Sequence, residues 1–327
     1  MRSDPRSASK NTMEEAKERI RNWRSGGILY LMNLGLTELP ELPEGVRTVY
    51  CYGNKLLSLP DTLPSTLLVL ECASNQLTTL PNTLPAGLKE LICNNNQLTT
   101  LPDTLPKGLT RLDCYVNRLT RLPDTLPATL RSLSCHNNQL VSLPNTLPAS
   151  LTKLVCSHNR LTRIPDTLPM GLTEFDCSHN RLRRLSDTLP AGLRQLYCQN
   201  NQLNTLPCTL PPALGWFQCH NNRLTTLPDT LPAGLILLYC SHNQLTTLPQ
   251  IHTNLVTFWY TNNAFPDREL DETNYEYIDR INAIAETASK ERITQRCALV
   301  FEELAQTVWH PSRVERRMLA GVDMEDM

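Results

Sequence analysis

Cysteine recurs every 21 residues through most of this 327-residue chain, and asparagine follows each of these cysteines by three positions. The repeated cysteines are Cys51, Cys72, Cys93, Cys114, Cys135, Cys156, Cys177, Cys198, Cys219 and Cys240. The repeated asparagines are Asn54, Asn75, Asn96, Asn117, Asn138, Asn159, Asn180, Asn201, Asn222 and Asn243. One such unit cannot bury its own apolar residues, so it must pack against the copies before and after it. The interval therefore predicts an elongated stack of repeats rather than a compact domain.

The complete unit reads Leu-x-x-Leu-x-Cys-x-x-Asn-x-Leu-Thr-x-Leu-Pro-Asp-Thr-Leu-Pro-x-x. Apolar residues in this pattern, with a period of about 20 to 29 residues, are typical of leucine-rich repeats. A degenerate unit over Leu29–Pro40 precedes the ten copies, and another over Leu255–Phe265 follows them with Tyr260 in the cysteine position. We therefore predict a leucine-rich-repeat solenoid of about 12 units over residues 28–265.

Each part of the unit has its own expected structure. The alternation around the second leucine and the cysteine predicts a short strand with both side chains inward, so the stacked strands form a parallel β-sheet on the concave face. The asparagine at the strand end is predicted to turn inward, where its amide must be hydrogen-bonded. Two prolines in each Leu-Pro-Asp-Thr-Leu-Pro segment exclude a helix and favour an extended or polyproline-II convex face.

The flanking segments carry helical patterns and are expected to cap both ends of the core. Residues 1–11 are polar and predicted to be disordered, and residues 12–27 are predicted to form an N-terminal helical cap. Thr12 and Glu15 form its capping box, and Gly26 lies at its end. Residues 266–327 carry 8 Lys+Arg and 14 Asp+Glu and are predicted to form a helical C-terminal cap or a small docking module.

Apolar residues at helical spacing mark two helices in this tail, and a capping box marks a third. The first is marked by Ile278, Ile281, Ile284 and Ala288. The second is marked by Ile293, Cys297, Val300, Phe301, Leu304 and Val308, and the capping box consists of Ser312 and Glu315.

Units of the form Asn-x-Leu-Thr-x-Leu-Pro-x-x-Leu-Pro resemble the LPX leucine-rich repeats of bacterial type III effectors of the YopM and IpaH/SspH type, and Leu34–Pro43 resembles their first repeat. The Cys-x-x-Asn-Asn-Gln-Leu-Thr-x-Leu-Pro units are also similar to giant-virus proteins, as are Trp309–Arg313 and Gly321–Asp323. These resemblances imply an effector or viral product that acts on host proteins. IpaH/SspH-type effectors carry a ubiquitin-ligase domain with a Cys-x-Asp motif, which Cys297–Leu299 does not match, so no ligase domain is expected.

The repeated cysteines are predicted to pack in the core, because a buried thiol behaves as a small apolar group and the chain has no Cys-x-x-Cys pair typical of zinc sites. Cys208 falls on a convex loop, where it is expected to be exposed and oxidisable, although a surface thiol without special reactivity is the simpler interpretation. No Ser/His/Asp set, P-loop or dinucleotide motif is present. We therefore predict that the chain is not an enzyme.

Five histidines are predicted at outward positions just after the cysteines, along one rim of the sheet. They are His136, His158, His179, His220 and His242. Histidines of neighbouring copies could bridge a divalent metal, but asparagine fills the same column in other copies, which favours a solvated polar rim. Those asparagines are Asn95, Asn137, Asn200, Asn221 and Asn262. We predict neither a metal nor a cofactor.

Two columns of outward positions vary from copy to copy. The column at the strand centre reads Tyr50, Glu71, Ile92, Asp113, Ser134, Val155, Asp176, Tyr197, Gln218, Tyr239 and Trp259. Its neighbour reads Thr48, Val69, Glu90, Arg111, Ser132, Lys153, Glu174, Gln195, Trp216, Leu237 and Thr257. Exposed aromatic residues are frequent in protein contacts. We predict partner contacts at Tyr197, Trp216, Leu237, Tyr239 and Trp259. We also predict a register-setting polar middle at Asp113, Glu174 and Asp176 with Arg111 and Lys153. Alternatively, the tail helices fold over Tyr239 and Trp259.

Composition narrows the range of partners. A formal net charge of −1 argues against a broad electrostatic contact with nucleic acid or an anionic membrane. No stretch approaches the ~20 apolar residues of a membrane span. The chain has no Asn-x-Ser/Thr sequon and no apolar core of a signal peptide at its start, so we expect an intracellular, reducing location such as the cytoplasm.

Together these patterns predict a non-enzymatic scaffold that binds a partner protein on its concave sheet. One alternative is a structural virion or assembly component, in which the repeats pack against a fixed neighbour. A second is a ligase adaptor that works through the acidic C-terminal tail.

Overall fold

The computed structural model describes residues 5–249, 254–266, 268–269, 272–273, 276–287, 290–291 and 294–295, with side chains from residue 12 onward. The chain divides into two compact units. The first comprises Met1–Leu245 and Pro249–Ala264, and the second comprises Thr246–Leu248 and Phe265–Met327.

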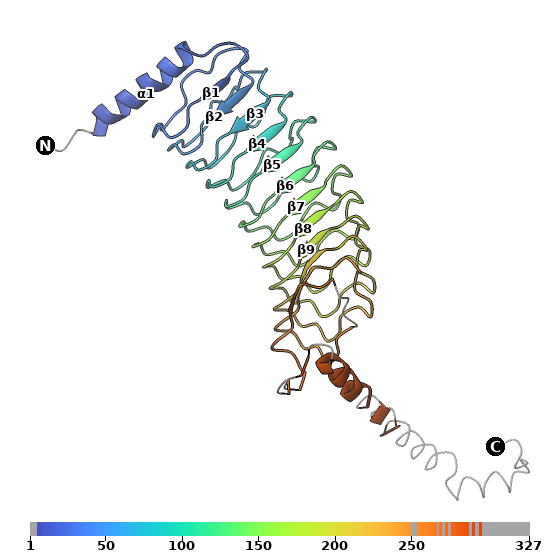
Figure 1. Ribbon diagram of the computed structural model, residues 1–327. Helices are drawn as coiled ribbons and strands as arrows, with labels where there is room; N and C mark the ends of the chain where they lie inside the picture. Colours follow the sequence, from blue (N-terminus) through green and yellow to red (C-terminus); the bar gives the residue numbers. More distant parts are fainter. Residues whose placement is uncertain are drawn as a thin grey trace, which may run out of the picture. The chain divides into compact units, whose positions relative to one another are not determined.

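The first unit contains a single sheet of short strands, one for each repeat (Figure 1). The strands are β1 (Ile28–Tyr30), β2 (Thr48–Tyr50), β3 (Val69–Glu71), β4 (Glu90–Ile92), β5 (Arg111–Asp113), β6 (Ser132–Ser134), β7 (Lys153–Val155), β8 (Glu174–Asp176), β9 (Gln195–Tyr197), β10 (Trp216–Gln218), β11 (Leu237–Tyr239) and β12 (Thr257–Trp259). All pairings between the described strands are parallel and follow chain order from β1 to β12. The predicted solenoid with a parallel sheet is confirmed.

The register of the sheet places equivalent residues of successive repeats side by side. Leu70 of β3 pairs with Leu91 of β4, which pairs with Leu112 of β5. Because each complete unit has the same length, every position of the repeat forms a continuous column along the stack. The middle residue of each strand from β1 to β11 is buried, and the columns on either side of it face outward.

The interior of the first unit consists of leucine and cysteine columns. All ten repeated cysteines are fully buried, as are the middle leucines of the strands. Phe175 and Phe217 take the leucine position in β8 and β10 and are the largest fully buried side chains. Burial of one leucine contributes roughly 1.5–3 kcal/mol relative to exposure. Stability therefore accumulates with each repeat, since each one covers the apolar residues of its neighbours.

The repeated asparagines connect each repeat to the preceding one. The Oδ1 atom of Asn138 accepts a hydrogen bond from the Leu119 N–H at 2.9 Å. Its Nδ2 group donates to the carbonyl oxygens of Cys114 and Cys135, both at 3.1 Å. Equivalent bonds recur in other copies from Asn75 to Asn243. Each side chain thus pairs backbone groups of two repeats that would otherwise lack partners at the end of the strand.

In the described part of the first unit, the only helix is the one at the N-terminus. The convex segments between the strands are not helical. Each contains a turn that the sequence pattern did not predict. In the repeat of β6, for example, the Leu130 N–H donates to the Pro127 carbonyl at 3.0 Å, and the same Pro-x-x-Leu turn recurs along the stack. The prolines exclude a helix, and this turn returns the chain to the next strand.

The N-terminal helix α1 (Pro5–Arg21) differs from its predicted boundaries. It begins before Thr12, so residues 5–11 are helical rather than disordered, and it ends before Gly26. Proline suits the first position of a helix because its φ is already fixed and its missing N–H needs no partner there. Beyond the helix, the Trp23 Nε1–H donates to the Gly27 carbonyl at 3.0 Å. Helix α1 contacts β1 at the start of the stack.

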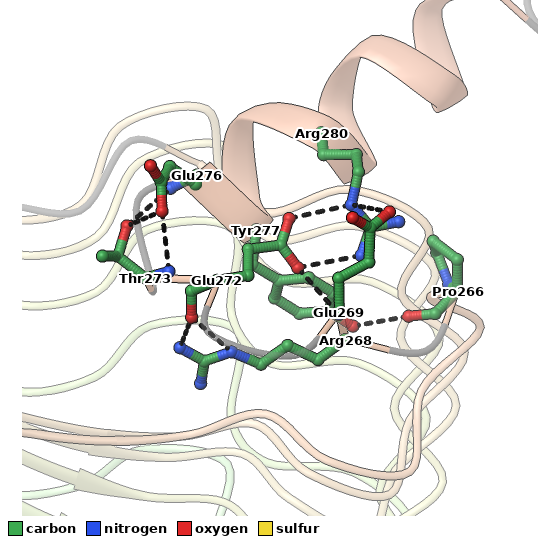
Figure 2. A network of polar contacts seen from close by, with 8 residues as sticks. All are labelled: Pro266, Arg268, Glu269, Glu272, Thr273, Glu276, Tyr277 and Arg280. Carbon is green, nitrogen blue, oxygen red and sulfur yellow. Dashed lines mark hydrogen bonds and ion pairs between the residues drawn. The ribbon is translucent and has the colours of Figure 1, made fainter.

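In the second unit, residues 276–287 are helical, and a capping box lies at their start (Figure 2). The Thr273 Oγ1 atom accepts the Glu276 N–H at 3.3 Å, and the Glu276 carboxylate accepts the Thr273 N–H at 2.8 Å. These reciprocal bonds satisfy backbone donors that the first helical turn leaves free. Tyr277, Ile278 and Ile281 of this helix are buried.

Further polar contacts hold this helix within its unit. Arg280 donates to both carboxylate oxygens of Glu272, at 2.8 and 2.9 Å, and its guanidinium lies 5.4 Å from the ring centroid of Tyr277. The Tyr277 hydroxyl donates to the Pro266 carbonyl at 2.7 Å (Figure 2). The Asn282 amide bonds both backbone groups of Leu248. The predicted second helix, with its apolar residues from Ile293 to Val308, and the Ser312–Glu315 capping box lie outside the described residues, and so does Ala288 of the first.

Candidate functional site

The two variable columns lie side by side on the outer surface of the sheet, which we call the sheet face. Trp216 pairs with Leu237, and Gln218 pairs with Tyr239. Neighbouring parallel strands lie about 4.8 Å apart, so residues of successive repeats can touch across the face. The face is therefore a surface on which every strand contributes two different side chains.

The C-terminal end of the sheet face is aromatic and apolar. Trp216 is 37% exposed and Trp259 is 59% exposed, while Tyr197, Leu237 and Tyr239 are half-buried. The rings of Tyr239 and Trp259 lie 5.6 Å apart in a tilted arrangement. We call these five residues the aromatic cluster. The structure brings the predicted contact residues together on β9 to β12.

The middle of the sheet face is charged. The Arg111 guanidinium lies 2.6 Å from the Asp113 carboxylate and 3.7 Å from that of Glu90. Asp113 is only 5% exposed, so the salt bridge shields a nearly buried carboxylate. Two strands further along, Lys153 of β7 pairs with Glu174 at 2.9 Å.

Asp176, the remaining predicted charged residue of the face, has no ion pair among the described residues. One of its carboxylate oxygens accepts hydrogen bonds from the N–H and hydroxyl of Ser178, at 3.0 and 2.7 Å. The predicted polar middle is thus two separate charged groups, one on β4 and β5 and one on β7 and β8.

The histidines after the cysteines occupy two columns, not the single rim that the sequence suggested. His158, His179 and His242 stand two positions after cysteine, where the backbone has φ between 50° and 54°. His136 and His220 stand one position after cysteine, where φ is not positive. The asparagine column at the former position includes Asn95 and shares this left-handed conformation.

Left-handed backbone explains which residues occur at that position. Asparagine, histidine and glycine tolerate positive φ better than most residues, and β-branched side chains are strongly disfavoured. Val116 departs from this rule with φ 51° and a side chain that is 40% exposed. The repeated Asn/His/Gly usage is the sequence signal for this conformation, although the same residues are also typical of a solvated rim.

The left-handed column also carries side-chain hydrogen bonds between repeats. The rings of His158 and His179 are stacked, with centroids 3.9 Å apart. Nδ2 of Asn200 lies 3.2 Å from Nε2 of His179, and the Asn221 amide donates to Asn200 Oδ1 at 3.1 Å. No group of three or more metal-ligating side chains occurs among the residues that the structure describes. Stacking and amide contacts account for the histidine pair.

Histidines of both columns have lowered pKa values. Burial is the main cause at His136, His179 and His220, and neighbouring histidines add to it. The His136 ring stacks on Tyr115 with centroids 4.3 Å apart. Buried Nδ1 atoms of His136 and His220 and Oε1 of Gln199 have no hydrogen-bond partner among the described residues. All three residues immediately follow a cysteine, so they lie just beyond the C-terminal ends of their own strands.

The repeated cysteines have raised thiol pKa values because they are buried. Burial raises the pKa of Cys72, Cys135 and Cys240 to about 12, so their reactive thiolate form is disfavoured near neutral pH. None of the cysteines within the described residues forms a disulfide, and Cys208 is exposed on the convex side. The cysteine column therefore acts as apolar packing.

Comparison with solved structures identifies the architecture. No protein-family model matches the chain, and no curated protein matches it. YopM from Yersinia pestis, described as a leucine-rich effector protein, is 28% identical over 82% of this chain and 93% of its own, with a TM-score of 0.59. The chain folds as a leucine-rich-repeat solenoid.

Two further leucine-rich-repeat structures share this similarity. YopM from Yersinia enterocolitica WA-314 is 32% identical over 73% of this solenoid chain, with a TM-score of 0.53. The functional domain of InlJ from Listeria monocytogenes, which includes a cysteine ladder, is 29% identical over 63% of the chain, with a TM-score of 0.57. The chain spans 61% of the length of the Y. enterocolitica YopM chain and 51% of that of the InlJ chain.

Sequence reasoning missed part of the charged region. Glu71 and Glu90 stand in the two variable columns, two strands and one strand before Arg111 respectively, and lie outside the set of predicted contacts. Their positions in the columns were the available signal. No helix among the described residues has the length and apolar character needed to cross a membrane.

Proposed function

We propose that this leucine-rich-repeat solenoid is a non-enzymatic scaffold that binds a partner protein through its sheet face. The observation that carries the proposal is the aromatic cluster, where Trp216 and Trp259 are exposed beside three more apolar or aromatic residues. Exposed aromatic side chains gathered in one place are unfavourable in water and are frequent at the centres of protein interfaces.

The rest of the sheet face supports a specific contact. Arg111, Asp113, Lys153 and Asp176 place fixed charges on β5, β7 and β8, which precede the aromatic cluster along the stack. Such charges add little net affinity, but they select the orientation of a partner and exclude partners with the wrong pattern. In this proposal the aromatic cluster supplies most of the binding free energy, and the charged groups set the register.

The proposed setting is the interior of a host cell, with a host protein as the partner. Similarity to YopM, a leucine-rich effector protein of Yersinia pestis, and the LPX form of the repeats support this setting. The resemblance to giant-virus repeat proteins makes a viral product a second possible source. No feature of the described residues favours the alternatives of a virion component or a ligase adaptor.

The test combines two substitutions in the aromatic cluster, Trp216→Ala and Tyr239→Ala. The double variant should lose capture of the partner from a host-cell lysate, because both rings are removed from the centre of the cluster, while the solenoid stays folded. The matched control replaces two exposed apolar residues away from the sheet face, Val141→Ala and Met170→Ala, which are 56% and 75% exposed.

The proteins recovered would be identified by mass spectrometry, and folding would be checked by circular dichroism. Equal capture by the wild type and the folded aromatic variant would refute the proposal. Equal loss in the control variant would also refute it, because binding would then not be specific to the sheet face.

A further inference from the structure

The charges on the sheet face do not balance. Two cations, Arg111 and Lys153, face five carboxylates, which leaves a surplus of three negative charges in the two columns of β1 to β12. The carboxylates are Glu71, Glu90, Asp113, Glu174 and Asp176. The formal charge of the whole chain is only −1. The face is therefore more negative than the chain as a whole, although the tail of residues 266–327 carries the larger acidic surplus.

The surplus is greatest at β3 to β5. Three carboxylates, those of Glu71, Glu90 and Asp113, share the single guanidinium of Arg111, and Asp113 holds it most closely at 2.6 Å. Glu71 has no ion pair among the described residues. Burial raises the pKa of Glu71, Arg111 partly offsets this, and Asp113 and Glu90 raise it further. An additional cation would stabilise the charged form of Glu71.

Basic residues do occur one position before four of the strands, at the edge of the sheet face. They are Arg47, Lys89, Arg131 and Arg194. None of them forms an ion pair with a carboxylate of the face among the described residues. They also do not contribute to the shifted pKa of Glu71, which responds to Arg111, Asp113 and Glu90. Among the described residues, the acidic region on β3 to β5 therefore has no ion-pair partner from this edge.

Aromatic residues lie next to the acidic region on one side and beyond three intervening strands on the other. Tyr30 and Tyr50 lie on β1 and β2 with ring centroids 5.8 Å apart, and the aromatic cluster lies on β9 to β12. Tyr115 follows β5 and stacks on His136. Aromatic faces attract both apolar side chains and the cations of lysine and arginine.

We propose that the sheet face binds a segment of the partner protein that carries lysine or arginine residues over Glu71, Glu90 and Asp113 and an apolar residue on the aromatic cluster. Charge complementarity selects this occupant. The same surplus repels nucleic acid and anionic membranes, because both present dense negative charge. This inference rests on the proposed function and specifies the chemistry of the partner.

The spacing of the sheet sets the length of such a segment. Seven strand intervals separate β3 from β10. At about 4.8 Å for each interval, the distance is roughly 34 Å, which an extended chain of about ten residues covers. A short peptide is therefore long enough to test the charged part of the proposal without the partner.

The test measures binding of two fluorescent peptides of about ten residues to the full chain by anisotropy. One alternates lysine with serine, and the other alternates glutamate with serine. The test variant, Glu71→Gln with Glu90→Gln, removes two charges of the sheet face with little change in shape. The control variant, Asp61→Asn with Asp124→Asn, removes two charges from exposed convex loops.

The wild type should bind the lysine peptide and not the glutamate peptide, and the affinity should decrease as salt is raised from about 0.05 to about 0.3 M. The test variant should bind the lysine peptide about tenfold more weakly, and the control variant should match the wild type. Equal binding of both peptides would overturn the inference. Equal weakening in both variants would overturn it too, since net charge alone would then explain the binding.

The outcome is separable from that of the proposed function. Loss of partner capture in the Trp216→Ala and Tyr239→Ala variant, together with no selective binding of the lysine peptide, would leave the scaffold in place and overturn only the cationic partner. Selective, Glu71- and Glu90-dependent binding of the lysine peptide would support the inference even where the aromatic substitutions left partner capture unchanged.

Discussion

The buried side of each repeat and its sheet face are formed by alternate residues of the same short strand, yet they vary in opposite ways. The cysteine and asparagine positions hold one residue type through ten copies. The outward position between the middle leucine and the cysteine changes at nearly every strand. A buried side chain is enclosed by equivalent side chains of two neighbouring repeats, so a change in its size or polarity disturbs three repeats. An outward side chain contacts only its neighbours and solvent.

This difference shows where stability and recognition are encoded. Substitutions of interior residues should lower the free energy of unfolding, whereas substitutions on the face should change contacts with little effect on folding. The aromatic cluster and the acidic region can therefore differ along the stack without altering its geometry.

The largest effect is expected at the core of β8. Phe175→Ala should lower the free energy of unfolding by about 3–5 kcal/mol, because the ring is fully buried and its removal leaves a cavity. The measurement is chemical denaturation of both proteins. The control is Phe175→Leu, which restores the residue found at this position in most repeats and should cost less than about 1.5 kcal/mol. A small effect of the alanine variant would contradict the buried position of the ring.

The second effect concerns the asparagine that connects repeats. Asn138→Ala should destabilise the chain by about 1–3 kcal/mol, because the Leu119 N–H and the carbonyl oxygens of Cys114 and Cys135 lose their partner. Thermal unfolding followed by circular dichroism measures the change. Asn145→Ala, on an exposed convex loop, should have little effect. Similar melting temperatures for the two variants would show that the asparagine contacts do not stabilise the stack.

The third effect should have the opposite sign. Val116→Asn should stabilise the chain by about 1 kcal/mol, because asparagine accepts the left-handed backbone that valine occupies at φ 51°. Val141→Asn is the matched control, since Val141 is also exposed but its backbone does not have positive φ. Denaturation midpoints of both variants decide the question. A loss of stability in Val116→Asn would show that the valine side chain makes a compensating contact.

The smallest effect concerns pH. The folded chain lowers the pKa of His136, His179 and His220 from 6.5, so the unfolded chain binds protons more readily. Their contribution to stability is therefore complete above about pH 6.5 and is lost as the pH falls below that value. The melting temperature, measured between about pH 7.5 and pH 5.5, should decrease on acidification. Replacing His136 and His220 with glutamine should reduce this decrease, and an unchanged pH dependence would contradict the assignment.

Most of the fold followed from the sequence. A constant interval of 21 residues can place equivalent residues side by side only if the units stack in register, so the parallel sheet, the inward cysteines and the outward columns could all be inferred from spacing. The boundaries of α1 were wrong, because the capping box at Thr12 competes with a favourable helix start at Pro5, and local patterns do not decide between them.

The candidate site was less predictable. The columns placed Arg111 and Asp113 on one strand and Glu90 on the strand before it. They did not show that Asp113 would hold the guanidinium and leave Glu71 without an ion pair among the described residues. The sequence predicts one rim of histidines, whereas the backbone separates them into two columns. These features depend on side-chain rotamers and on backbone conformation at the end of the strand.

The sequence by itself determined the register of this protein, because a repeat of fixed length and apolar pattern can bury its leucines and cysteines in only one alignment with its neighbours. Only the tertiary structure decided which charges pair, which aromatic rings touch and which positions adopt left-handed backbone. Those outcomes depend on distances of a few ångströms between side chains of different repeats, and the spacing of residues along the chain does not specify them.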